Sequence, residues 1–147
     1  MSTEQNKATL KRYYDEILNK GNYSLWGELM DDDYYLESPT ARSDKGLEAA
    51  KQGYEMRKTF SSDGQFLIDE MIAEGDAVAI RGYLKGTNTG EAPAQGIPTA
   101  TGKQYNAAFA AVYYFKNGKI AKCWTLHDTL TRYQQLGVTP PSAPAGS

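Results

Sequence analysis

The residues with the clearest chemical potential lie near the end of the chain, where Asp128 follows Trp124 on the last predicted strand. Side chains alternate between the two faces of a strand, so Trp124, Leu126 and Asp128 are expected to share one face. A carboxyl group beside apolar side chains can have a raised pKa, and such a group can act as a general acid or base. The same aspartate could instead cap the helix that begins at Thr129, and the pattern alone favours that simpler role. The sequence therefore leaves two roles open for Asp128.

Other side chains could assist such a carboxyl group. Arg81 lies in the middle of a predicted strand, where it is either exposed or turned inward as the partner of a carboxylate. Glu37, at the end of an early strand, either faces a pocket or lies at the surface. The aromatic side chains are expected to line a pocket, with core packing as the alternative. The candidates for pocket walls are Tyr14, Tyr35, Tyr83, Phe109, Tyr113 and Trp124.

Two reactive side chains are expected to take no part in catalysis. Strand alternation turns His127, the single histidine, to the face opposite Asp128, and the single cysteine, Cys123, is typical of a buried, inert thiol. One cysteine excludes an internal disulfide, and one histidine excludes a two-histidine metal clamp. Acid–base chemistry is therefore expected from carboxylates alone, without a metal site.

Length and charge narrow the classes of function. A chain of 147 residues fits one domain, which we expect over residues 1–139, with a flexible tail over 140–147. Sixteen Lys and Arg against eighteen Asp and Glu give no electrostatic case for nucleic acid or for an anionic membrane. No segment is apolar enough for a membrane span or a signal peptide, so a cytoplasmic protein is expected. The acidic run Asp31–Asp33 is interpreted as a solvated turn at a helix end.

The elements that must position these residues are helices first and strands afterwards. Apolar residues recur at helical spacing in the first part of the chain, and the predicted helices and strand there cover about 3–20, 24–30, 34–37 and 46–60. Alternating strands follow over 66–73, 77–85, 103–116 and 119–128, and a short helix over 130–136 closes the domain. Asn117-Gly118 is a strong signal for a tight hairpin turn. This order predicts an α+β fold with helices on one face of a curved, mostly antiparallel sheet.

Short motifs follow one another along the chain in a specific order. They are Ile72–Arg81, Gly86–Glu91, Gly96–Lys103, Asn117–Ile120, and Trp124-x-x-x-Asp128 leading to Gln135-Leu136-Gly137. With these motifs the chain resembles, from about Leu10 to Gly137, the SnoaL-like polyketide cyclase family of the nuclear transport factor two-like superfamily. The resemblance implies a cone-shaped barrel, in which the sheet wraps around the N-terminal helices and a central pocket.

The resemblance also implies a function. Such enzymes close a ring in a hydrophobic, carbonyl-bearing polyketide by an intramolecular aldol reaction without metal or organic cofactor, and an aspartate at the position of Asp128 is the general acid/base. Family members often carry histidines at the positions of Asn88 and Ala111. Two alternatives stay open. Arg81 with Asp128 resembles the site of limonene-epoxide hydrolases, whose second aspartate would fall near Tyr83, and a non-catalytic module that binds small ligands is also common in the superfamily.

The resemblance further implies a homodimer that forms through the outer face of the sheet. On the third long strand, the face opposite Phe109 and Tyr113 carries mostly small residues, which would let a second sheet approach closely. These residues are Ala108, Ala110, Val112 and Tyr114.

Overall fold

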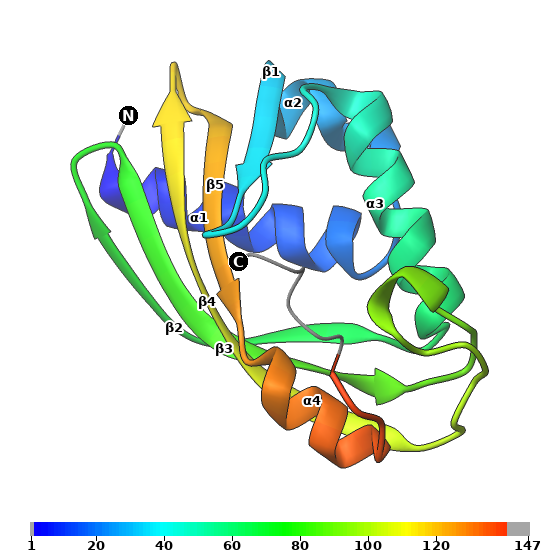
Figure 1. The fold of residues 1–147 in the computed structure, drawn as a ribbon. Coiled ribbons are helices and arrows are strands. Elements are labelled where there is room, and N and C mark those ends of the chain that lie inside the picture. The colour runs from blue at the N-terminus through cyan, green and yellow to red at the C-terminus, as the bar shows by residue number, and fades with distance from the viewer. Residues whose placement is uncertain (1, 141–147) are drawn as a thin grey trace.

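A five-stranded mixed sheet forms the centre of the fold in the computed structural model, which describes residues 2–140 (Figure 1). The tail predicted over 140–147 lies outside the described residues apart from Pro140. The strands are β1 (Met30–Glu37), β2 (Gln65–Glu74), β3 (Ala77–Thr87), β4 (Gln104–Lys116) and β5 (Lys119–His127). Their order across the sheet is β1-β5-β4-β3-β2, and every neighbouring pair is antiparallel except β1 with β5.

The helices lie on the concave side of this sheet or at its end (Figure 1). They are α1 (Thr3–Arg12), α2 (Trp26–Leu29), α3 (Leu47–Phe60) and α4 (Thr129–Leu136), and a π-helical segment over Tyr13–Leu18 extends α1. Short 3-10 turns cover Tyr23–Leu25 and Pro93–Gln95. Helix α1 begins at a capping box, in which the Ser2 hydroxyl accepts from the Gln5 amide and the Gln5 side chain accepts from the Ser2 amide. No helix of residues 2–140 is long and apolar enough to cross a membrane.

The apolar stripe of the first helix lies against the concave side of the sheet. Leu10, Tyr13, Tyr14 and Ile17 are all buried, as their helical spacing predicts. Helix α1 packs against β2, β3 and β5, whereas α3 lies across from the sheet and is joined to it by few contacts (Figure 1). The predicted α+β fold with N-terminal helices is therefore confirmed. The sheet is not closed into a barrel, because β1 and β2 are its two free edges.

The hairpin between β4 and β5 sets which side chains face inward. Asn117 and Gly118 have φ values of 52° and 77°, which a tight turn of the predicted type requires. A register shift between Tyr114 and Phe115 precedes the turn, and beyond it Phe109 lies opposite His127. Phe109 is buried on the concave side, so His127 faces that side as well.

Candidate active site

Two adjoining cavities open on the concave side of the sheet, between its strands and α3. The larger one, here called the main cavity, has a volume of about 590 Å³, and the smaller inner cavity has about 240 Å³. Leu36, Gly53, Arg57 and Phe66 line both of them. A combined space of this size suits a ligand with fused rings.

Among the strand residues that the structure describes, His127 is the only one with a titratable side chain that lines the main cavity. Its ring stacks on Phe109 with centroids 5.5 Å apart and planes 19° apart, and the Phe66 ring lies 6.4 Å away. Burial, together with the nearby positive charge of Arg132, lowers the pKa of His127 from 6.5 to about 4. The imidazole is therefore neutral at pH 7 and can accept a proton at one nitrogen while donating from the other.

The two cations of the main cavity come from the helices. Arg57, on α3, donates to the carbonyl oxygens of Leu18 and Gly64, and its guanidinium lies 4.8 Å from the centre of the Phe66 ring. Arg132, on α4, lies 5.4 Å from the centre of the Phe60 ring. Burial lowers the pKa of both arginines, and neither belongs to an ion pair within residues 2–140.

Asp128 lies outside this cavity. It is the N-cap of α4, where one carboxylate oxygen accepts from the Thr131 amide at 3.1 Å and the other from the Thr131 hydroxyl at 2.6 Å. These hydrogen bonds lower the pKa of Asp128, and the carboxylate is exposed. The acid/base role of Asp128 stays a prediction, but the predicted environment is wrong: the carboxyl group is solvated and held in its charged form.

The two other predicted polar residues also lie on the outer side. Arg81 pairs with Glu70 at 3.1 Å and Asp69 at 3.6 Å, and 60% of its side chain is exposed, so it has no inward carboxylate partner. Glu37 pairs with Lys122 at 3.5 Å. An arrangement of Arg81 with Asp128 like that of an epoxide hydrolase is thus contradicted by the geometry.

The predicted aromatic walls divide into two groups. Tyr14, Phe109 and Tyr113 face inward, as predicted, but they belong to the buried core and do not line the two cavities. The hydroxyl groups of Tyr14 and Tyr113 lie 2.7 Å apart, and burial raises the pKa of both. Their hydroxyls therefore satisfy each other inside the core, where an unpaired polar group would be destabilising.

The other three aromatic candidates face away from the cavities. Trp124 lies opposite Val112 on the outer face, Tyr83 is partly exposed on the same face, and the ring of Tyr35 is covered by Arg42, 4.1 Å from its centre. Strand alternation was predicted correctly, but the wrong face of β5 was assigned to the pocket. The pairing of Phe109 with His127 across the Asn117-Gly118 hairpin is the signal that could have corrected it.

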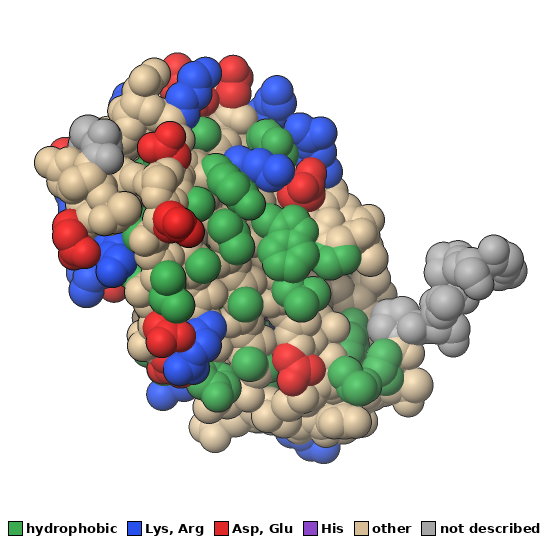
Figure 2. Space-filling view, turned by 90° about the vertical axis from the view of Figure 1, so that its left-hand side faces the viewer, with side chains coloured by type: hydrophobic (Ala, Val, Ile, Leu, Met, Phe, Trp, Pro, Cys, Tyr) green, Lys and Arg blue, Asp and Glu red, His purple; other side chains and the backbone are tan. Residues whose placement is uncertain are grey.

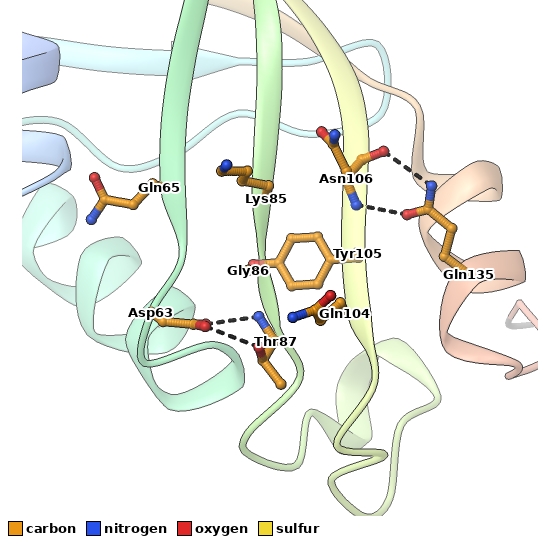
Figure 3. Close-up of a pocket in the computed structure, with 9 residues that line it drawn as sticks. All are labelled: Asp63, Gln65, Lys85, Gly86, Thr87, Gln104, Tyr105, Asn106 and Gln135. Atoms are coloured by element: carbon orange, nitrogen blue, oxygen red, sulfur yellow. Dashed lines mark hydrogen bonds between the residues drawn. The ribbon is translucent and has the colours of Figure 1, made fainter.

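A separate polar groove of about 580 Å³ lies where the ends of β3 and β4 meet α4 (Figure 3). Some of its polar groups bind one another. Asp63 accepts from the Thr87 amide and hydroxyl at 2.7 and 2.9 Å, and Gln135 exchanges two hydrogen bonds with the backbone of Asn106 (Figure 3). These contacts tie α4 and the loop after α3 to the sheet.

No cluster of three or more His, Cys, Asp or Glu side chains within residues 2–140 is arranged to hold a metal ion. Cys123 is buried among aromatic side chains, and burial raises the pKa of its thiol to about 12. The thiol is therefore protonated at neutral pH and unsuited to nucleophilic attack.

The lowered pKa of His127 predicts a pH dependence of stability. The unfolded chain takes up a proton near pH 6.5, whereas the folded protein does so only near pH 4. His127 therefore has almost no effect well above pH 6.5, and its contribution decreases the free energy of unfolding as the pH falls between these values, by about 3 kcal/mol in total. In urea unfolding, the free energy of unfolding should differ less between pH 7.5 and pH 4.5 in the His127→Gln variant than in the wild type. An equal difference in both proteins would contradict the buried, neutral imidazole.

Comparisons with known proteins agree with this fold. The family model for SnoaL-like polyketide cyclases matches residues 8–136. A candidate polyketide cyclase from Acidithiobacillus ferrooxidans is 26% identical, with a TM-score of 0.78 over 93% of this chain and 98% of that one. A candidate SnoaL-like polyketide cyclase from Jannaschia sp. CCS1 is 18% identical, with a TM-score of 0.81 over 94% and 95% of the two chains. TsrD from Streptomyces laurentii is 19% identical, with a TM-score of 0.80 over 95% and 99%. No match to a curated protein was found.

Proposed function

Because the chain belongs to the SnoaL-like polyketide cyclase family, we propose that it closes a ring in a hydrophobic, carbonyl-bearing metabolite such as a polyketide. The proposed reaction is an intramolecular aldol addition that uses the protein's own acid–base groups and no cofactor. The observation that carries this proposal is the position of His127, a neutral imidazole on the wall of a largely apolar cavity with Arg132 close by.

In the proposed mechanism, His127 is the general acid/base. The imidazole takes a proton from the carbon between two carbonyl groups, and the positive charge of Arg132 stabilises the resulting enolate. The enolate carbon forms the new bond to a second carbonyl carbon of the same molecule, and the imidazolium returns the proton to the alkoxide. The negative enolate formed beside His127 offsets the field of Arg132 and stabilises the imidazolium that results from the proton transfer.

Asp128 has a positioning role in this proposal. Its carboxylate caps α4 directly between His127, the last residue of β5, and Arg132 on the first turns of the helix. A fixed cap holds the two groups in one arrangement, and such fixed geometry accounts for much of the rate in reactions of this kind. The family resemblance assigns the acid/base role to Asp128 itself, so the two adjacent residues are the variants to compare.

The experiment that tests the function is a turnover assay with a blocked cavity. The substrate is an aromatic β-keto ester with a second ketone placed for six-membered ring closure, and product formation is followed by its absorption and by mass spectrometry. A Cβ atom at Gly53 would meet no atom within 4 Å, so Gly53→Phe places a ring in the space that both cavities share. We expect ring closure by the wild type and its loss in Gly53→Phe.

The matched control is Gly27→Phe, because Gly27 is equally open but lies on α2, away from both cavities. This variant should turn over substrate like the wild type. If the wild type binds the keto ester in the cavity without cyclising any compound of this class, the protein is a binding module and the enzymatic proposal is wrong.

The outer face of the sheet is proposed to pair with a second copy of the chain. Hydrophobic side chains gather over the middle of the face that carries β2, β3 and β4, with acidic and basic side chains around them (Figure 2). Tyr83, Tyr114 and Leu126 are partly exposed there, beside the small residues of β4. A broad apolar face on a small protein is typical of an interface.

A homodimer is therefore expected in light scattering after size exclusion. Ala110→Lys would place a charge at the centre of this face and should give a monomer that is still folded by circular dichroism. A wild type that stays monomeric at high concentration would contradict the proposed pairing.

A further inference from the structure

We propose that the main cavity is specific for ligands with an anionic head on an apolar aromatic body, and that Arg132 and Arg57 bind the head. The head would be a carboxylate. This inference rests on the proposed function, because it names the substrate class of the same cavity.

Of the two arginines, Arg132 gives the stronger evidence for an anionic ligand. Its Nε atom is buried and has no hydrogen-bond partner within residues 2–140, and its guanidinium makes no ion pair there. A guanidinium group has five N–H donors, and a buried donor without an acceptor is destabilising. The flat face of the group is covered by Phe60, which leaves its N–H edge for an acceptor in the cavity. An anionic ligand would supply that acceptor.

Arg57 adds a second positive charge to the same cavity. Two of its N–H groups bind carbonyl oxygens, which fixes the side chain across the Phe66 ring, and its remaining donors have no partner within residues 2–140. Its side chain lines both cavities. Because carbonyl groups are neutral, these contacts orient the guanidinium without compensating its charge.

The rest of the lining does not neutralise the two arginines. Among the residues of 2–140 that line the main cavity there are two arginines and no aspartate or glutamate, although the whole chain has more acidic than basic residues. Asp44 lines the inner cavity, but it is exposed and makes no ion pair with Arg57. The remaining walls include Leu36, Phe66 and Leu84, which suit an apolar body. The cavity thus combines an apolar wall with an uncompensated positive charge.

The test compares an acid with its neutral ester. Isothermal titration calorimetry would measure the affinity of 2-naphthoate and of methyl 2-naphthoate for the full, tag-free protein at pH 7.5. We expect the acid to bind about 10-fold more tightly, because a charge-assisted hydrogen bond replaces a neutral one. The Arg132→Gln and Arg57→Gln variants should lose most of this preference while keeping the affinity for the ester. Arg81→Gln, which removes an exposed arginine on the outer face, is the control and should bind both probes like the wild type.

A second readout uses the single histidine of the chain. An anion bound beside Arg132 would raise the pKa of His127, and the imidazole signals in a nuclear magnetic resonance titration belong to that residue alone. The acid should raise this pKa and the ester should not.

The possible outcomes separate the two proposals. The anionic specificity would be overturned if the ester bound as tightly as the acid or more tightly, or if Arg132→Gln lost affinity for both probes equally. Either result would leave the proposed cyclase function intact. Failure of both probes to bind at millimolar concentration would contradict the specificity and also the proposal that this cavity takes an aromatic substrate.

Discussion

Replacement of His127 by glutamine is expected to lower kcat for ring closure by about 100-fold or more, the usual range for loss of a general acid/base. Glutamine can donate and accept hydrogen bonds at a similar place, but it cannot take up a proton. KM should change little if the cavity walls and the two arginines hold the substrate. The measurement is steady-state turnover of the aromatic β-keto ester, with the folded state checked by urea unfolding at pH 7.5.

Asp128→Asn is the matched variant in the adjacent position. Asparagine is as good an N-cap as aspartate, so the junction between β5 and α4 should stay in place and kcat should stay within about two-fold of the wild type. Asp128→Ala removes the cap and should lower the free energy of unfolding by about 1 kcal/mol. The reverse result, with activity lost in Asp128→Asn and kept in His127→Gln, would return the acid/base role to the aspartate that the family resemblance indicates.

The wild-type pH profile gives an independent check of the same assignment. A base whose pKa is about 4 in the free enzyme should give kcat/KM values that are constant around neutrality and fall only at acid pH. In the His127→Gln variant, the remaining kcat/KM should not show this fall at acid pH.

The largest effect on stability is expected at Asn88. Its side chain is 0% exposed and makes hydrogen bonds to four groups. The amide nitrogen donates to the carbonyl oxygens of Phe60 and Gly90, at 3.2 and 2.8 Å. The amide oxygen accepts from the backbone and hydroxyl of Thr101, both at 2.8 Å. Asn88→Ala would leave these groups buried without partners and should lower the free energy of unfolding by about 3 kcal/mol.

The control for Asn88 is Asn106, an exposed asparagine whose backbone, and not its side chain, binds Gln135. Asn106→Ala should change stability by less than about 0.5 kcal/mol. Asn88→His, which introduces the residue that the family resemblance implies there, should also be destabilising, because an imidazole cannot reproduce the two donors and two acceptors of an amide. A loss below about 1 kcal/mol in Asn88→Ala would contradict the structural role.

These contacts also give a physical reason for an asparagine at position 88, where the family resemblance implies a histidine. The side chain joins the end of α3, the loop after β3 and Thr101, and it lines neither cavity. The amide is therefore part of the framework that holds Phe60 under Arg132, rather than a substitute for a proton-transferring histidine. At this position packing therefore determines the residue.

Local patterns in the sequence were sufficient to predict the helices and strands of the fold. The helical spacing of Leu10, Tyr13, Tyr14 and Ile17 predicts the buried stripe of α1, and Asn117-Gly118 predicts the hairpin turn between β4 and β5. These signals depend on residues close together in the chain, so the order of helices and strands follows from them. The strand that begins at Met30 was predicted four residues late, because three aspartates are atypical of a strand.

Only the tertiary structure decided which side chains form the site. Alternation divides β5 into two faces, and it does not tell which of them is concave. The face with Trp124 and Leu126 was interpreted as a pocket wall because it is apolar, but the outer face of this sheet is apolar as well. His127 faces inward because it pairs with Phe109 on β4. The sequence did not indicate that Arg57 and Arg132 belong to the site, because an arginine on a helix is ordinarily exposed. Their burial depends on α3 and α4 meeting the open side of the curved sheet, and that contact joins segments far apart in the chain.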